Sequence, residues 1–314
     1  MNTTRNVSLR SLPLLLLLAT TLSAVAGNRS GSVTGQFLKL PVDARAVAMG
    51  NAQVALAEGV VSMGYNPAGI LSTKQFAFGA TYNQWYADIT HSFMGVAVNL
   101  NEWGTIGVGA VILATDEMAV TSPAFPEGTG EIFKASEYAF TVSYGRQISE
   151  EFGLGLSAKY VKSNLYNDEI DASAVAFDIG SLYDIPVLHT RLGISVTNLG
   201  QDLKYINEQY SLPTTLRFGA RTGVFEDENH ALFAAAQVGR PNDSEEQYNV
   251  GVEYVYQKLV ALRSGYRFNY DTENWSGGLG VSLSSLGLDG RLDYSYTNYS
   301  YLPGTHMFSI EIGF

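Results

Sequence analysis

The feature that most constrains the fold of this chain is a two-residue alternation of side chains that recurs from residue 75 to the C-terminus. Segments of about ten residues alternate apolar with small or polar side chains, and clusters of Gly, Pro, Asn, Asp and Glu separate them. In residues 138–145, alternate positions are Tyr, Phe, Val and Tyr, and those between are Ala, Thr, Ser and Gly. Because successive side chains of a β-strand point to opposite faces, the pattern predicts an all-β fold.

The alternation defines 14 candidate strands, an even number as in single-chain bacterial outer-membrane barrels. No proline lies inside a segment, and Pro213 only opens one, as expected because proline cannot donate a ladder hydrogen bond. The connections alternate between longer and shorter, as in a barrel with long extracellular loops and short periplasmic turns. The segments are residues 75–82, 89–99, 104–115, 135–146, 152–164, 172–184, 190–199, 213–223, 230–240, 246–256, 258–268, 275–284, 287–297 and 305–314.

Hydropathy excludes a helical membrane protein. Beyond the N-terminal leader, no apolar stretch approaches the roughly 20 residues of a spanning helix, and the mean hydropathy is only +0.03. Charged residues are nonetheless only 16% of the chain, against about 25% in ordinary soluble domains. A chain that crosses a membrane without helices must close into a barrel, because hydrocarbon offers no partner for an unpaired backbone group. We therefore expect residues 75–314 to form a 14-stranded antiparallel transmembrane outer-membrane β-barrel.

A soluble β-sandwich is the alternative, since its strands alternate as well. A sandwich packs its apolar faces into a core, whereas here the other face of neighbouring strands carries Gly, Ser, Ala and charged residues, which suits a wet lumen. Tyr and Phe are frequent near segment ends, as in the aromatic girdles of membrane barrels. The charges expected to face the lumen are Lys159, Asp178, Arg217, Arg221, Glu253, Arg263, Arg267, Asp289, Arg291, Asp293 and Glu311.

These lumen charges allow two interpretations. A charge in a narrow lumen is costly unless it is paired or hydrated, so the charges could form a salt-bridge lattice that stiffens the barrel and holds the N-terminal segment. They could instead line a selective polar path, as rings of charge do in pores. The sequence leaves both open, and we expect Arg45 of the N-terminal segment to pair with a lumen acid such as Asp178.

Residues 1–26 have the features of a secretory signal peptide. Arg5 and Arg10 are its only charges, residues 12–19 are apolar, and Ala24-Val25-Ala26 is a cleavage motif. The apolar run is too short to span a bilayer, so we expect cleavage before Gly27 rather than a membrane anchor. The chain has no cysteine, which excludes a lipoprotein and a disulfide scaffold.

Residues 27–74 do not alternate. Residues 43–57 are rich in alanine and interrupted by Gly50, which predicts one or two short helical turns. Asn66 is a good N-cap and Pro67 suits the first helical position, so another short helix is expected to begin there. Because this segment has no core of its own, we expect it to form a small helical plug inside the barrel or at its periplasmic mouth. A flexible periplasmic tail is the alternative.

Three N-terminal motifs resemble the PorV/PorQ family of outer-membrane proteins: Phe37-Leu38-Lys39, Ala44-Arg45-Ala46-x-Ala48-Met49-Gly50, and Asn66-Pro67-Ala68-Gly69-Ile70. Shorter matches follow at Trp85, Asp178-Ile179-Gly180, Asn198-Leu199-Gly200, Leu212-Pro213 and Leu262-Arg263-Ser264-Gly265-Tyr266. The resemblance covers nearly all of the chain after the leader. It implies the architecture of FadL-type transporters, with 14 strands and a plug that carries an Asn-Pro-Ala element. The plug motif then comprises Arg45, Gly50, Asn66, Pro67, Ala68 and Gly69.

The resemblance implies two different functions. PorV-like members accompany the type IX secretion system and receive cargo by its C-terminal domain or help attach it at the cell surface. FadL-like relatives pass hydrophobic small molecules through a plugged barrel. We expect the secretion role, with passage of a hydrophobic ligand as the alternative. The longest loop, residues 116–134, is modest for a secretion member, and we expect it to contact a partner or act as a lid, or to fold back over the barrel mouth.

The last segment ends the chain on an aromatic residue and resembles the C-terminal recognition signal of outer-membrane barrels. Its apolar positions are expected to be read by the barrel assembly machinery, and the finished barrel to contact lipid in the outer membrane of a Gram-negative bacterium. The signal positions are Phe308, Ile310, Ile312 and Phe314.

Catalysis, metal binding and nucleic-acid binding are not expected. The four histidines occur singly, and no metalloprotease, lipase or P-loop motif is present. His91 and Ser92 are adjacent and so point to opposite faces of a strand. Loop acids such as Asp168 and Asp243 could hold calcium only weakly, and solvated carboxylates are the simpler reading. A formal net charge of -11 argues against a nucleic-acid partner, and no cofactor is expected.

Overall fold

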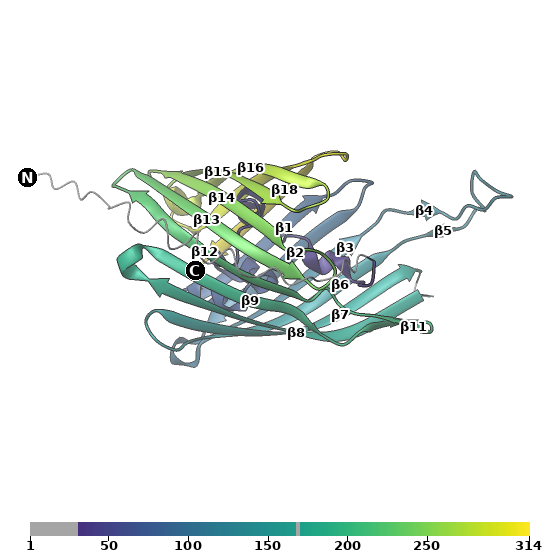
Figure 1. Cartoon of the computed structure of the whole chain (residues 1–314), viewed down its shortest axis with the longest axis horizontal. Coiled ribbons are helices and arrows are strands. Elements are labelled where there is room, and N and C mark those ends of the chain that lie inside the picture. The colour runs from purple at the N-terminus through teal and green to yellow at the C-terminus, as the bar shows by residue number, and fades with distance from the viewer. Residues whose placement is uncertain (1–30, 168–169) are drawn as a thin grey trace, which may run out of the picture.

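A closed antiparallel barrel accounts for most of the chain (Figure 1). The computed structural model describes residues 31–167 and 170–314, so the predicted signal peptide lies outside the described residues. The barrel strands are β1 (Phe76–Gln84), β2 (Thr90–Asn99), β3 (Thr105–Ala114), β6 (Ser136–Gln147), β7 (Phe152–Tyr166), β8 (Ile170–Ile185), β9 (Thr190–Gly200), β12 (Thr215–Glu226), β13 (His230–Pro241), β14 (Gln247–Tyr256), β15 (Val260–Phe268), β16 (Glu273–Ser282), β17 (Asp289–Tyr299) and β18 (Thr305–Gly313).

The predicted strands correspond one to one with these 14 barrel strands, and the ends differ by only a few residues. Each strand pairs with its sequence neighbours in the barrel, and β1 closes the wall by pairing with β18, where Tyr82 lies opposite Phe308. The prediction of a 14-stranded antiparallel barrel is therefore confirmed. Two short hairpins stand apart from the barrel sheet: β4 (Met118–Ala119) with β5 (Ile132–Phe133), and β10 (Leu203–Tyr205) with β11 (Glu208–Tyr210).

The two faces of the wall have opposite character. On β6, the outward Phe140 and Val142 are each 53% exposed, whereas the inward Thr141 and Ser143 are 6% and 0% exposed. A soluble sandwich would bury the large apolar set and expose the polar set. The reverse holds here, because hydrocarbon replaces water outside and the lumen contains polar groups.

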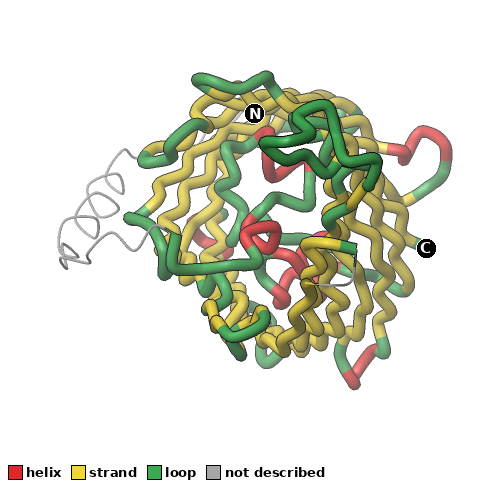
Figure 2. The backbone as a smooth tube through the Cα atoms, turned by 90° about the vertical axis from the view of Figure 1, so that its right-hand side faces the viewer, coloured by secondary structure: helices red, strands yellow, loops and turns green. Residues whose placement is uncertain are grey.

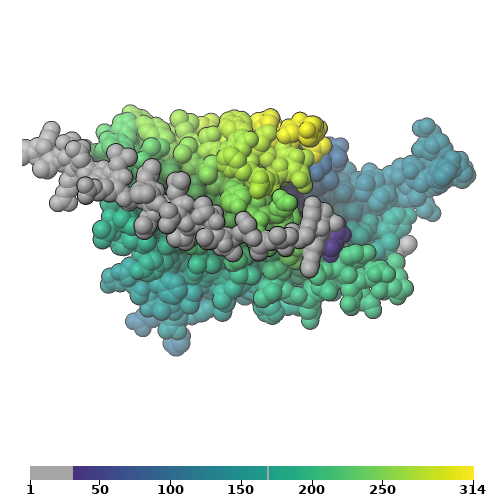
Figure 3. Space-filling model, viewed as in Figure 1, coloured from purple at the N-terminus to yellow at the C-terminus, as the bar shows by residue number. Residues whose placement is uncertain are grey.

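Connection length differs between the two ends of the barrel. One end has short turns, three of which contain the helical turns η5 (Asn101–Trp103), η6 (Pro186–Leu188) and η7 (Leu283–Leu286). The other end has the longer loops, and we call it the outer end because long loops face the cell exterior in such barrels. The β4–β5 hairpin projects far beyond this end (Figures 1 and 3), so of the two alternatives for this loop, folding back over the mouth is wrong.

Residues 33–74, which we call the inner segment, lie within the ring of strands (Figure 2). The segment contains η2 (Gln36–Lys39), α2 (Ala44–Ala48), η3 (Val60–Gly64) and η4 (Pro67–Ser72). The side chain of Asp43 caps α2 by accepting a hydrogen bond from the Arg45 amide, and Asn66 caps η4 in the same way. No helix among the described residues is both long and apolar enough to cross a membrane.

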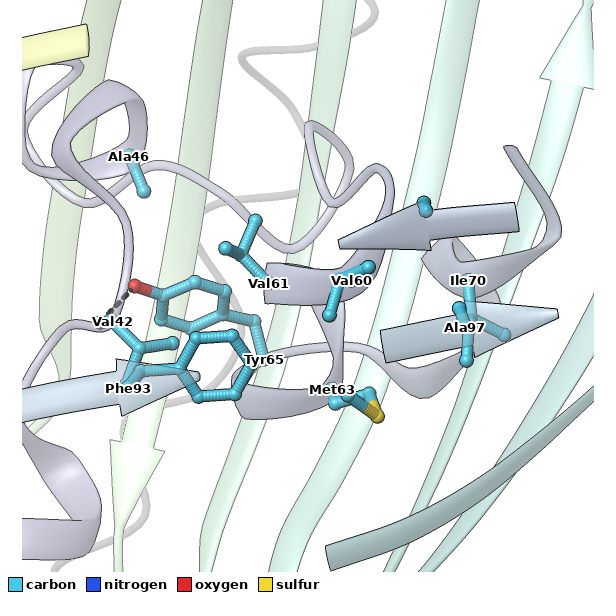
Figure 4. Packing of buried hydrophobic residues seen from close by; sticks show 10 residues of the cluster. Val42, Ala46, Val60, Val61, Met63, Tyr65, Ile70, Phe93 and Ala97 are labelled. Atoms are coloured by element: carbon cyan, nitrogen blue, oxygen red, sulfur yellow. Dashed lines mark hydrogen bonds between the residues drawn. The ribbon is translucent and has the colours of Figure 1, made fainter. Parts of the chain in front are cut away.

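The inner segment runs the length of the lumen and is not a free tail. Val33 bridges to Ser211 in an outer loop, whereas the Thr73 carbonyl accepts a hydrogen bond from Asn99 at the opposite end. Its apolar side chains form a core with the inward face of β1 and β2, in which Tyr65 and Phe93 lie together (Figure 4). Burial of these side chains favours the inserted position of the segment. The cluster comprises Val42, Ala46, Val60, Val61, Met63, Tyr65, Ile70, Ala77, Phe93 and Ala97.

Candidate functional site in the barrel lumen

An ion network centred on Arg45 and Glu253 lies in the periplasmic half of the lumen. Arg45 Nη2 lies 2.9 Å from Glu253 Oε1, and Arg45 Nη1 lies 2.8 Å from Oε2 of Glu58 in the inner segment. Burial by itself lowers the pKa of Arg45, but the charges of Glu253 and Glu58 outweigh it and raise this pKa well above its ordinary value. Arg45 is thus held as a cation between the inner segment and β14.

The network continues from Glu253 along the wall. Arg263 Nε lies 2.5 Å from Glu253 Oε2, and Arg263 Nη1 lies 2.5 Å from Asp293 Oδ1. Arg291 follows, with Nε 3.0 Å from Asp293 Oδ2 and Nη2 3.1 Å from Glu311 Oε2. Opposite charges therefore alternate across β14, β15, β17 and β18. This pairing supports the lattice interpretation for the periplasmic half, since unpaired charges there would be costly.

The prediction that Arg45 pairs with a lumen acid is confirmed, but that acid is Glu253 and not Asp178, the example that the sequence suggested. The helix that carries Arg45, α2, packs against β15, β16 and β17, whereas Asp178 lies on β8. Asp178 Oδ2 instead lies 2.7 Å from Lys159 Nζ on β7, and Oδ1 accepts a hydrogen bond from the Asn198 amide. Asn198 has a left-handed backbone (φ 60°) at a bulge in the β8–β9 pair. The alternation identifies inward positions but does not identify which strand the inner segment approaches.

Asp289 also differs from the prediction of a lumen charge. Its side chain is 58% exposed at the periplasmic rim, where Oδ2 lies 2.6 Å from Lys74 Nζ. Asp289 is separated by an even number of residues from the inward-facing positions of β17, so the alternation predicts that it faces the lumen. Because β17 begins at Asp289, however, no barrel wall surrounds its side chain. Arg221 is half-buried and lies over the Phe233 ring, 4.1 Å from the ring centroid, and no described acid lies within ion-pair distance of it.

The plug-motif residues hold the inner segment to the wall through backbone contacts. Gly50 has φ 64°, and a Cβ atom there would lie 2.5 Å from the Val250 carbonyl oxygen. Asn66 is fully buried and donates to the Val54 and Ser181 carbonyls at 2.9 and 3.0 Å. The following Pro67, Ala68 and Gly69 form the buried start of η4, which packs against β6, β7 and β8.

The predicted assembly-signal residues lie on the last strand and at the chain end. Phe308 and Phe314 are exposed on the outside of the barrel, whereas Ile310 and Ile312 are partly covered. The Phe314 amide donates to the Phe76 carbonyl, which joins the chain end to the start of β1. Recognition of these residues by the assembly machinery stays a prediction.

A cavity of about 500 Å³ occupies the outer half of the lumen. Its lining includes two of the predicted lumen charges, Arg217 and Arg267. Lys39 and Asp243 lie at one side, with Nζ 2.9 Å from Oδ2. Burial raises the pKa of Asp243, but hydrogen bonds from Lys39 and Gln36 outweigh it and lower this pKa. Asp243 is therefore a buried, paired carboxylate rather than the solvated loop acid expected from the sequence.

The lumen residues that the sequence did not identify include Glu58, Tyr270 and Arg191. Glu58 lies in the inner segment, where no periodicity indicates direction, and Tyr270 lies in an outer loop. Arg191 lies 3.2 Å from Glu58 and 2.7 Å from Asp184. Arg191 lies two and four residues before the small residues at positions 193 and 195 on β9, and therefore on the same, inward face of the strand. That spacing was the signal that could have identified it. Within the described part of the chain, no group of three or more metal-ligating side chains is present.

Acid is expected to loosen the inner segment through Glu58. Burial raises the pKa of Glu58, but the charges of Arg45, Arg221 and Arg191 outweigh it and lower this pKa from 4.5 to about 2. A lowered pKa means that the stabilisation by Glu58 is complete above pH 4.5 and is lost as the pH falls through about 2. Urea unfolding of the full chain in detergent across this range should show a fall in stability that is smaller in E58Q. An equal fall in both proteins would contradict the assignment.

Comparison with known proteins gives one family match. A family model described as "Type IX secretion system protein PorV" matches residues 24–240, which is more than half of the chain. No curated protein sequence matches the chain significantly.

Solved structures share the fold at low sequence identity. The toluene transporter TodX of Pseudomonas putida gives a TM-score of 0.59 at 12% identity, covering 87% of this chain and 97% of that chain. The Ralstonia pickettii toluene transporter TbuX gives 0.56 at 12% identity, with coverages of 88% and 99%. A CymD monoaromatic hydrocarbon channel gives 0.58 at 14% identity, with coverages of 86% and 96%. Identities this low establish a common barrel architecture alone.

Proposed function

Because this chain belongs to the family of the type IX secretion system protein PorV, we propose that it is an accessory of type IX secretion that receives secreted cargo or helps attach it at the cell surface. The match over residues 24–240 carries this proposal. The closed 14-strand barrel and the family place the protein in the outer membrane of a Gram-negative bacterium. Family and fold are those of a secretion-associated protein or channel, and we assign no catalytic role.

The arrangement of the lumen supports a binding role more than a conduit. The inner segment runs through the barrel, and the Arg45–Glu253 network ties it to the wall. The outer end, by contrast, presents the β4–β5 hairpin and the open outer cavity to the cell exterior. Cargo that has already crossed the membrane would meet these outer features first. Cargo C-terminal domains and other secretion components are therefore the proposed partners.

Passage of hydrophobic small molecules is the alternative, and it rests on the fold shared with proteins named as hydrocarbon channels. The outer cavity is a poor match for such a ligand, because Arg217, Arg267 and Gln237 contribute to its lining. Strand pairing also closes around the whole wall, although the β8–β9 ladder is interrupted at its bulge, where Asp178 and Asn198 have no register partner across that ladder. The secretion role therefore agrees better with the described lumen.

Deletion of the gene tests the two functions against each other. We expect the deletion strain to lose most of the surface-attached cargo that carries type IX C-terminal domains, and a plasmid copy of the gene to restore it. Surface cargo is measured by labelling intact cells and identifying the labelled proteins by mass spectrometry. Unchanged surface cargo would overturn the secretion role, and an accompanying loss of toluene or fatty-acid uptake would support the alternative.

The β4–β5 hairpin is expected to be needed for cargo handling but not for barrel assembly. It projects from the outer end, pairs with no barrel strand, and exposes Phe125 and Ile132. Replacing residues 118–133 by a short Gly-Ser linker should lower surface cargo several-fold while leaving a folded, heat-modifiable barrel. Leu286→Ser, at an exposed position in a periplasmic turn, is the matched control and should leave cargo unchanged. Wild-type cargo levels in the linker variant would exclude the hairpin.

A further inference from the structure

Two buried arginines in the outer half of the lumen lack acidic partners. Arg217 on β12 is 8% exposed and Arg267 on β15 is 5% exposed, yet neither forms an ion pair with any residue that the structure describes. The buried Arg45 and Arg263 in the periplasmic half each contact two carboxylates. Arg217 and Arg267 therefore differ from the other two buried arginines of the same lumen, which are neutralised by carboxylates.

The hydrogen-bonding capacity of these arginines is also largely unused. Nε and Nη2 of Arg267 are buried and have no hydrogen-bond partner among the described residues. Arg217 donates from Nη1 to the Thr197 hydroxyl at 2.8 Å. A guanidinium withdrawn from bulk water is costly unless acceptors replace the lost water. Its planar donors match the oxygens of a carboxylate or a phosphate.

Both arginines line the outer cavity, which has a volume of about 500 Å³. Burial raises the pKa of Tyr270 in the same cavity, a hydrogen bond with Asn249 and the charges of Arg267 and Arg217 oppose this rise, and the charge of Glu273 adds to it. Asn83 and Ser295 add buried side-chain oxygens without partners in the described structure. The positive charge of the two arginines therefore converges on one polar cavity.

Acidic groups also line this cavity, but they do not neutralise the arginines. Asp243 is paired with Lys39. Asp271 is exposed and Glu273 is half-buried, so these two carboxylates lie nearer to solvent than the arginines. None of these three carboxylates forms an ion pair with Arg217 or Arg267.

From this arrangement we propose that the outer cavity binds an oxyanion, a carboxylate or phosphate group of a small polar ligand or of a larger molecule that enters from the cell exterior. Arg267 is the main ligand-binding residue and Arg217 the second. A pocket of this size accommodates an organic acid or a phosphate ester. The proposal does not depend on the secretion role, because it concerns only the two arginines of the cavity that lack ion-pair partners.

The test uses the full chain, purified in detergent in a phosphate-free buffer at constant ionic strength. Isothermal titration calorimetry measures binding of inorganic phosphate, of succinate and, as a neutral probe, of glycerol. We expect saturable binding of at least one anion and none of glycerol, and the preferred anion distinguishes a phosphate ligand from a carboxylate ligand. Absence of saturable binding of either anion at millimolar concentrations would overturn the proposal.

Variants then locate the site. R267Q should weaken anion binding by about tenfold, because it removes charge-assisted hydrogen bonds. R240Q removes the same charge near the same mouth but from a residue that pairs with Glu246 outside the cavity lining, so its affinity should be unchanged. Equal affinities of R267Q and R240Q would overturn the assignment.

Folding of the variants is checked by heat modifiability and thermal melting. R267Q removes an unpaired buried charge, so it should melt no lower than the wild type without anion, while anion should stabilise the wild type more. A purely structural Arg267 would give the opposite result, a lower melting temperature with unchanged anion stabilisation. R267K retains the charge and should keep part of the anion affinity. If R267Q does not fold, the anion affinity of R267K tests the role of Arg267 instead.

Discussion

Replacing Glu253 by glutamine is expected to lower the free energy of unfolding by about 3–5 kcal/mol. The Glu253 carboxylate is buried and accepts from Arg45 Nε at 3.0 Å, Arg45 Nη2 at 2.9 Å and Arg263 Nε at 2.5 Å. Glutamine has nearly the same volume, so the change removes charge without leaving a cavity. It leaves two buried guanidinium groups without their shared carboxylate. Urea unfolding in detergent, followed by tryptophan fluorescence, measures the loss.

Asp289→Asn is the matched control for this prediction, since it also converts a carboxylate to an amide. Its ion pair with Lys74 is solvent-exposed, so the free energy of unfolding should change by less than about 1 kcal/mol. Equal effects of the two substitutions would show that burial in the lumen does not set the strength of the network. The Arg45–Glu253 contact would then not hold the inner segment.

Gly50→Ala is expected to expel the α2 region of the inner segment from the wall and to lower the free energy of unfolding by about 2–5 kcal/mol. Gly50 has φ 64°, which disfavours any residue with a Cβ atom. That atom would also lie 2.5 Å from the Val250 carbonyl oxygen and 2.7 Å from the Tyr266 amide nitrogen. Both are backbone atoms of the barrel wall, which cannot move away without a cost in free energy. Cleavage by trypsin after the normally buried Arg45 should report the displacement.

Gly287→Ala separates the two causes. Gly287 has a similar backbone angle, φ 74°, but nothing lies within 4 Å of a Cβ atom there. Its substitution should cost only about 1–2 kcal/mol and should leave Arg45 resistant to trypsin. If G50A were also resistant and no less stable than G287A, the close approach of the inner segment to β14 and β15 would not matter for its position.

The division of the lumen into two halves bears on function. The periplasmic half contains a network of matched charges beside smaller cavities of about 210 and 120 Å³, whereas the outer half contains the cavity of about 500 Å³ and the buried Arg217 and Arg267, which form no ion pair with any described residue. A molecule from outside can therefore enter part of the barrel, but the paired network opposes passage across it. This asymmetry agrees with a protein that holds partners at the cell surface.

The sequence by itself determined the barrel: its strand number, the outward face of residues such as Phe140, and the helical start at Asn66. These features depend on local rules, namely the two-residue period of a strand and the chemistry of a helix cap. They can be read without knowing which segments meet.

Only the tertiary structure decided which charges pair. Arg45 meets Glu253 rather than Asp178 because the path of the inner segment and the stagger of the strands bring residues 208 positions apart into contact. The alternation assigns Asp289 to the inward face, but Asp289 lies at the rim because β17 begins there. The unpaired Arg267 likewise emerges only when the positions of all neighbouring acids are known. Charge pairing depends on three-dimensional proximity, and a periodic pattern contains no information on that distance.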